Sequence, residues 1–135
     1  MKDRGRTLFC LLAGGGDALT GLLLVAAPEL VLHLLGLKRP DGNLAFLRFV
    51  GVFVGCVGLA YVYPWLLFDG ESRARRIVSA LEITAGVRLA VALFLGVAVA
   101  SSQLDLPWVA VGTYDAVVAS TQIGLLVFGV FQDED

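Results

Sequence analysis

Ionisable side chains lie inside stretches of this sequence that are otherwise apolar. A charge inside a bilayer is costly, so such residues either pair with one another or bind a proton, a cation or a polar ligand. General acid–base catalysis would need such a pair to face a pocket, and no spacing in the sequence indicates a pocket. We therefore predict no catalytic residue and favour the interpretation that the protein is not an enzyme in its own right. The ionisable residues within these apolar stretches are Asp17, Arg48, Glu82, Arg88 and Asp115.

The stretches that hold these residues are predicted to be transmembrane helices. Of the 135 residues, 58% are hydrophobic and 16% are charged, and the mean hydropathy is +0.84. A soluble domain this small cannot bury so much apolar surface, whereas a helix of about 20 apolar residues crosses about 30 Å of hydrocarbon. The sequence thus predicts an all-α fold, a polytopic membrane four-helix bundle in a single domain, 1–135. The predicted spans are 7–27, 44–68, 77–100 and 108–131.

A short amphipathic segment follows the first predicted span. In "PELVLHLLGL", Glu29 and His33 lie four residues apart on one face, and almost every other position is Leu or Val. This pattern predicts a helix over 29–36 that lies in the membrane interface and stops at Gly36.

Basic residues are distributed unevenly between the two ends of the spans. Loops rich in Lys and Arg stay on the cytoplasmic side. The N-terminal segment and the loop between the second and third spans are the richer ones, so we expect both termini to be cytoplasmic. The residues on that side are Lys2, Arg4, Arg6, Arg73, Arg75 and Arg76, and those on the other are Lys38 and Arg39.

Three of the intramembrane charges are expected to meet near the middle of the membrane. At 1.5 Å per residue, Arg88 lies about 18 Å from the cytoplasmic edge, Asp115 reaches the same level, and Asp17 rises to about 15 Å. A guanidinium can bridge two carboxylates. We therefore predict a buried Asp17–Arg88–Asp115 cluster. Such a cluster either binds a ligand or has the structural role of fixing helix register.

Glu82 is the acid for which the sequence offers no basic partner at the same depth. Its level is close to that of Gln122, which shares a helical face with Asp115 because seven residues make nearly two turns. Glu82 and Gln122 are thus the candidate site for a proton or a small ligand, with a purely structural role as the open alternative.

Glycines are spaced so that two helices can approach closely. Small residues at a spacing of three or four permit tight helix contacts in membranes. Arg48 falls on the same stripe of the second span, so we expect it either to point into this packing face or to contact a lipid phosphate. The packing glycines are Gly14 and Gly21 in the first span and Gly51, Gly55 and Gly58 in the second.

Several functional classes lack a signature in this sequence. The one histidine, His33, cannot supply a bis-histidine haem site, and no nucleotide-binding, hydrolase or zinc fingerprint occurs. No basic, aromatic-rich segment suggests nucleic acid. We predict no metal site, no nucleic-acid partner and no evident cofactor.

The segments "GDALTGLLLVAAPELVLHLLGL", "LRFVGVFVGCVGLAYV" and "GVRLAVALFLG" resemble the DoxX-like group of small four-helix bacterial membrane proteins. The resemblance covers nearly the whole chain and implies a bacterial cytoplasmic (inner) membrane location, with a quinone-contacting or redox-linked role. The chain is also similar in size and helix count to small multidrug transporters. It departs from their pattern because Arg48 and Arg88 would tend to neutralise a cation-binding acid.

Together these features lead to two functional hypotheses. The first is an accessory or assembly subunit of a larger membrane complex, quinone- or redox-linked as the resemblance implies. The alternative is a small proton-coupled carrier, or a membrane protein that binds lipid or a small ligand through Glu82 or Asp17. In either case the expected partners are membrane lipids and other membrane subunits or further copies of the chain, and quinone or lipid is the expected ligand.

Overall fold

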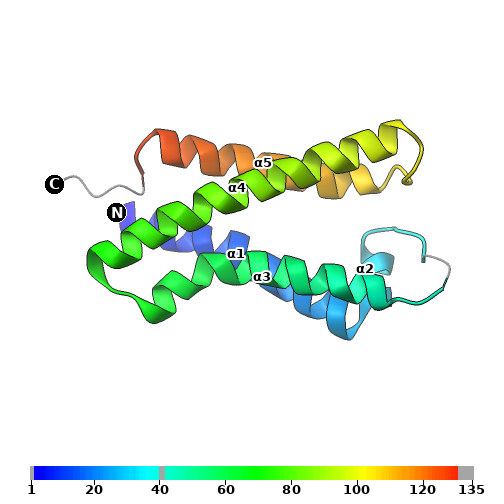
Figure 1. Ribbon diagram of the computed structural model, residues 1–135, viewed down its shortest axis with the longest axis horizontal. Coiled ribbons are helices and arrows are strands. Elements are labelled where there is room, and N and C mark those ends of the chain that lie inside the picture. The colour runs from blue at the N-terminus through cyan, green and yellow to red at the C-terminus, as the bar shows by residue number, and fades with distance from the viewer. Residues whose placement is uncertain (1, 40–41, 131–135) are drawn as a thin grey trace. The chain divides into compact units, whose positions relative to one another are not determined.

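The described part of the chain, residues 2–39 and 42–130 of a computed structural model, is helical and contains no strand (Figure 1). The predicted all-α class is confirmed. All the helices except the short α2 are long and apolar enough to cross a membrane. The helices are α1 (Lys2–Ala26), α2 (Pro28–Leu34), α3 (Ala45–Leu67), α4 (Gly70–Ala100) and α5 (Trp108–Val127).

Three helices differ in extent from the predicted spans, and the first of them, α1, begins at Lys2 rather than residue 7. Helix α4 begins at Gly70 rather than residue 77, because Glu, Arg and Ala in "GESRARR" favour helix even where they are too polar for lipid. Helix α5 ends at Val127, because Gly129 adopts a positive φ of 63° and reverses the chain. The last residue predicted for this span, Phe131, lies outside the described residues, as do the side chains of Lys2, Arg4 and Arg6.

The boundary between α1 and α2 is set by a proline. Ala27 precedes Pro28, which disfavours helical geometry at the residue before it, so the chain breaks there and α2 starts with proline at its first turn. The predicted stop at Gly36 is confirmed. Its φ is +66°, and the Leu37 N–H donates to the Leu32 carbonyl at 2.8 Å.

Helix α4 ends in the same motif but uses serine where glycine is favoured. Ser102 has φ 57°, its N–H donates to the Val99 carbonyl at 3.0 Å, and the Gln103 N–H donates to the Ala98 carbonyl at 2.8 Å.

Replacing Ser102 by glycine is expected to stabilise the protein by about 1 kcal/mol, because glycine adopts this left-handed conformation without a Cβ penalty. Thermal unfolding in detergent micelles measures the effect. Ser101→Gly is the control, since Ser101 has φ −89° and gains nothing from glycine. An equal gain in both variants would contradict this explanation.

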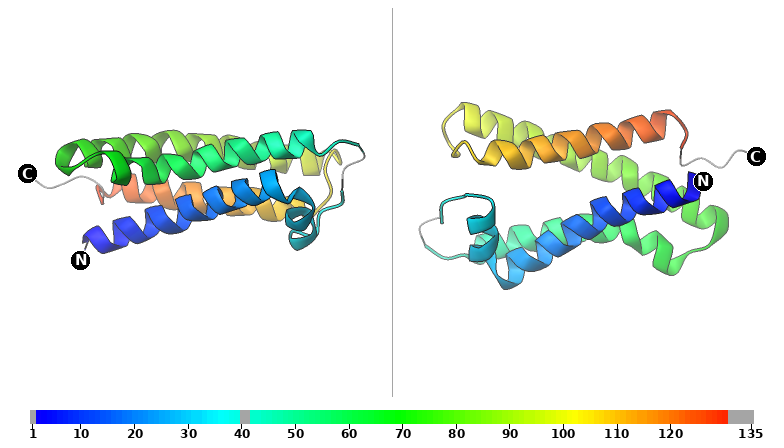
Figure 2. Two further views of the ribbon diagram at one scale, coloured as in Figure 1. Left: turned by 90° about the horizontal axis from the view of Figure 1, so that it is seen from below. Right: turned by 180° about the vertical axis from the view of Figure 1, so that it is seen from behind.

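The helices form two compact units, residues 1–67 and 68–135. In the first unit α1 lies along α3, and α2 folds back on the end of α1; in the second, α4 lies along α5 (Figure 2).

The contact between α1 and α3 is made through glycine. A Cβ built on Gly14 would lie 2.6 Å from Tyr61 Cβ and 2.8 Å from the Gly58 carbonyl oxygen. A Cβ on Gly21 would lie 2.6 Å from both the Gly51 oxygen and the Gly55 Cα. The two backbones therefore touch, as interfaces rich in small residues allow in membranes.

Arg48 does not take part in this contact. Its side chain is exposed, which differs from the expectation that it points into the packing face. The first glycine of the stripe in α3, Gly51, meets Leu24 and Val25, and α1 ends at Ala26. Arg48 lies one turn before Gly51, nearer the start of α3 and beyond the end of α1. Helical side chains lean toward the N-terminus, which here is away from the contact.

Candidate functional site

The polar residues of α4 and α5 meet on the faces that these helices turn toward each other. Arg88, only 3% exposed, donates through Nη1 to Asp115 Oδ1, and the two form an ion pair. Asp115 and Gln122 share one face of α5 with the fully buried Ala119. Lipid cannot solvate a guanidinium, so this pairing supplies the charge and hydrogen bonding that Arg88 needs.

Tyr114 adds an aromatic contact to this ion pair. The centroid of its ring lies 5.6 Å from the Arg88 guanidinium carbon, within the range of a cation–π interaction. Arg88 is thus held by two adjacent residues of α5, one anionic and one aromatic.

A second polar contact joins the same helices nearer the start of α4. Gln122, which is fully buried, donates through Nε2 to Thr84 Oγ1 at 2.9 Å and to the Leu81 carbonyl at 3.3 Å. Thr84 in turn donates to the Ala80 carbonyl at 2.7 Å. Gln122 Oε1 has no hydrogen-bond donor among the described residues.

The Thr84→Val variant is expected to lose about 1 kcal/mol of stability, because valine keeps the shape but removes the acceptor for Gln122. Thr121→Val is the matched control, since among the described residues that exposed hydroxyl bonds only to the Val117 carbonyl of its own helix, at 2.9 Å. Unfolding titrations in mixed micelles compare the two. Equal losses would show that the Gln122 bond contributes nothing specific.

Glu82 does not lie with Gln122, as the sequence had suggested. Its neighbour Leu81 and also Thr84 belong to the buried face of α4, whereas Glu82 is exposed. One residue rotates the direction of a side chain by about 100°, so equal depth does not bring two residues together. Among the residues that the structure describes, Glu82 has no ion pair or hydrogen bond.

Asp17 is buried on α1 of the first unit. Its predicted place beside Arg88 and Asp115 stays a prediction.

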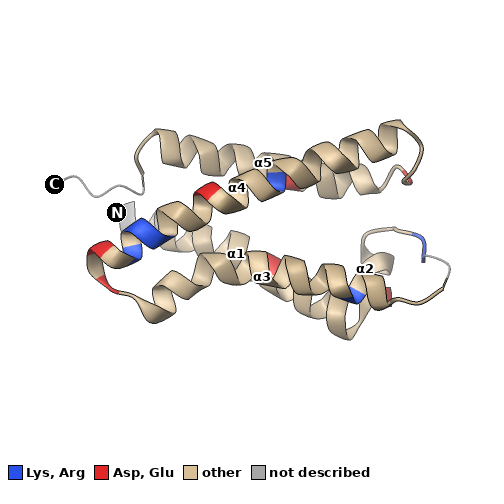
Figure 3. Ribbon diagram, viewed as in Figure 1, with Lys and Arg blue, Asp and Glu red and all other residues tan. Residues whose placement is uncertain are grey.

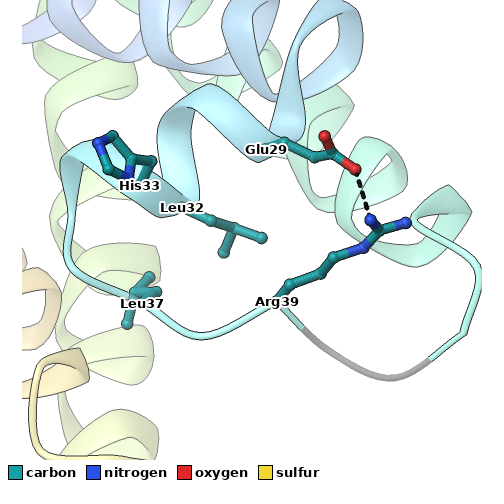
Figure 4. Close-up of a pocket in the computed structure, with 5 residues that line it drawn as sticks. All are labelled: Glu29, Leu32, His33, Leu37 and Arg39. Carbon is teal, nitrogen blue, oxygen red and sulfur yellow. Dashed lines mark ion pairs between the residues drawn. The ribbon is translucent and has the colours of Figure 1, made fainter.

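A hollow of about 240 Å³ lies between α2 and the segment that follows it (Figure 4). Leu32 and Leu37 are its apolar part, His33 lies at one side, and Glu29 Oε1 pairs with Arg39 Nη1 at 3.0 Å. Both partners of this ion pair are well exposed, so it contributes little stability. The described residues contain no cluster of three or more His, Cys, Asp or Glu side chains able to hold a metal ion.

Thr84, Tyr114 and Tyr61 make contacts that were not predicted from the sequence. The depth calculation could have suggested Tyr114, because it adjoins Asp115. Thr84 gave no such signal, since a threonine in an apolar helix usually bonds to its own backbone. Tyr61 lies three residues beyond Gly58, so the glycine spacing could have placed it on the packing face of α3.

No family model, curated protein or solved structure matches the chain.

Proposed function

We propose that this protein is an accessory or assembly subunit of a larger membrane complex, and that its intramembrane polar groups hold helices in register. The observation that carries the proposal is the pairing of Arg88 with Asp115 and of Gln122 with Thr84 between α4 and α5. Groups committed to each other in this way serve helix association, which lacks a hydrophobic driving force in lipid.

The outer faces of the long helices support an assembly role. Large apolar side chains are exposed on each of them, and such surfaces in a membrane contact lipid or neighbouring subunits. Examples are Leu22 on α1, Phe53 on α3, Leu93 on α4 and Val117 on α5.

The finer parts of the proposal extend the sequence analysis. The four long helices form one bundle in the bacterial cytoplasmic membrane, with both termini cytoplasmic and α2 in the opposite interface. The resemblance to DoxX-like proteins supports a redox-linked complex with quinone as the ligand. The exposed leucines of α2, Leu30 and Leu34, support an interfacial position because they need apolar surroundings.

Gentle extraction from the native membrane, followed by mass spectrometry of the intact assemblies, tests the accessory role. We expect the chain to travel with larger membrane subunits. A photo-crosslinker at the exposed Leu59 should then capture one of those subunits, whereas the same group at the buried Ala119 should not. Recovery of a free monomer, or of a small homo-oligomer carrying lipid or quinone, would overturn the proposal.

A second candidate function is favoured by Glu82, an exposed carboxylate on an apolar helix. Such a group suits a small proton-coupled carrier or a protein that binds a lipid or small ligand. Uptake of a substrate into proteoliposomes should then be coupled to protons and lost in Glu82→Gln. Uptake that this variant leaves unchanged would rule out Glu82 as the coupling residue.

A further inference from the structure

The first turns of α4 carry a basic face with an open hollow. Ser72, Arg75, Arg76 and Ser79 line a hollow of about 240 Å³. Their spacing of three, four and seven residues puts them on one side of the helix. The two guanidinium groups are positively charged and only donate hydrogen bonds, and the two hydroxyls beside them can rotate to donate as well. This combination suits phosphate oxygens. Basic residues lie together with acidic ones at this end of the helix (Figure 3).

The acids near this face do not pair with the two arginines. Glu71, in the first turn of α4 and four residues before Arg75, forms no ion pair or hydrogen bond with any residue that the structure describes. Asp69 pairs with Arg73 Nη2 at 2.6 Å, so the nearest acid on the preceding loop is engaged. Arg75, by contrast, has no ion pair, hydrogen bond or ring contact with any residue that the structure describes. Glu82 lies seven residues beyond Arg75, which separates them by about 10 Å along the helix axis.

Arg76 is held in place without losing its charge. Its guanidinium carbon lies 3.8 Å above the centroid of the Phe68 ring. A cation–π contact of this kind fixes the plane of the guanidinium, and its N–H groups still donate outward at the edges. Arg76 is therefore preorganised for an anion, and Arg75 beside it is available.

The position of the hollow along α4 indicates where the anion comes from. Beyond Ser79 the same face carries the exposed Glu82 and then becomes apolar. It continues with the exposed Ile83, 68% of whose surface is accessible, and with Gly86, whose Cβ position faces open space. A phosphate with apolar chains attached fits a basic region followed by an apolar surface, because the chains can cover that surface. A free anion would contact the basic region alone.

We propose that Ser72, Arg75, Arg76 and Ser79 bind the phosphate group of an anionic phospholipid whose acyl chains lie along the Ile83 and Gly86 face of α4. The headgroup carries a net negative charge because none of the described residues that line the hollow is a carboxylate able to receive an ammonium group. In this respect the site differs from the hollow beside α2, where Glu29 accompanies Arg39. The site does not depend on the accessory role proposed above.

Mass spectrometry of the intact full chain in detergent, titrated with dioleoyl phosphatidylglycerol or dioleoyl phosphatidylcholine, tests the assignment. Wild type should prefer phosphatidylglycerol, and R75Q/R76Q should weaken its binding about 30-fold while leaving phosphatidylcholine unchanged. R75K/R76K, which keeps both charges, should retain most of the binding. K38Q/R39Q removes the same charge from the segment that follows α2 and should retain wild-type binding.

The outcomes that overturn the proposal are distinct. Equal binding of the two lipids, or unchanged phosphatidylglycerol binding in R75Q/R76Q, would show that no anionic headgroup is recognised here. Displacement of phosphatidylglycerol by millimolar inorganic phosphate would assign the hollow to a soluble anion instead of a lipid. Circular dichroism checks that R75Q/R76Q remains folded. We expect it to fold because both arginines are exposed and neither is paired with a buried group.

Discussion

Arg88→Leu is expected to destabilise the protein by about 3 kcal/mol, because it leaves the Asp115 carboxylate in a largely buried position without its cation. The double variant Arg88→Leu/Asp115→Leu removes both charges and should recover most of that loss, since two well-packed apolar side chains replace a buried ion pair at little net cost. Reversible unfolding in mixed micelles, followed by circular dichroism, measures both variants.

The exposed ion pair beside α2 provides the control. Glu29 and Arg39 are 61% and 63% exposed, and their charged atoms lie 3.0 Å apart. Arg39→Leu should therefore change stability by less than about 1 kcal/mol. If Arg39→Leu cost as much as Arg88→Leu, or if the double variant were no more stable than the single one, the role of Arg88 and Asp115 in holding α4 to α5 would be refuted.

The faces of α1 and α3 could be predicted from sequence because glycine spacing carries the helical period. Gly14 and Gly21 meet Gly58, Gly51 and Gly55 across the pair. The spacing could not show where the contact ends. That limit is set by the last residue of the partner helix, Ala26, and it explains why Arg48 is exposed although it continues the stripe.

The depth of a residue in the membrane predicted its contacts less well than the side of the helix on which it lies. Arg88 and Asp115 share a level and a facing direction, and they pair. Glu82 was assigned to Gln122 on level alone, and the direction differs because Leu81 and Thr84 occupy the side that faces α5. The start of α4 at Gly70 could not be predicted from the apolar span over 77–100, because apolarity indicates where lipid begins and not where a helix begins.

The function could not be derived to the same extent as the fold. The helical period is set by backbone geometry, and the need for apolar residues is set by lipid, so a single sequence shows both. A partner subunit or a quinone is recognised by a surface that has no fixed sequence spacing. The proposals for this chain therefore depend on particular contacts, such as Arg88 with Asp115 and Arg76 with Phe68.

The glycine contact between α1 and α3 leads to the second large expected effect. Gly21→Ala places a Cβ against the backbone nitrogen of Gly55 and 2.6 Å from the Gly51 carbonyl oxygen. Backbone atoms cannot move aside as a flexible side chain can, so the helices must separate along the contact. We expect a loss of about 3 kcal/mol, at the upper end for overpacking.

Gly86→Ala is the matched control for this substitution, because it makes the same chemical change in a helix where the new Cβ meets no atom within 4 Å. Alanine is the better helix former by about 1 kcal/mol, so this variant should be as stable as wild type or slightly more stable. Unfolding in mixed micelles compares the two alanines. A loss in Gly21→Ala alone would show that backbone contact between α1 and α3 stabilises the first helix pair. If Gly21→Ala were as stable as Gly86→Ala, the two helices would not approach as closely as their glycines allow.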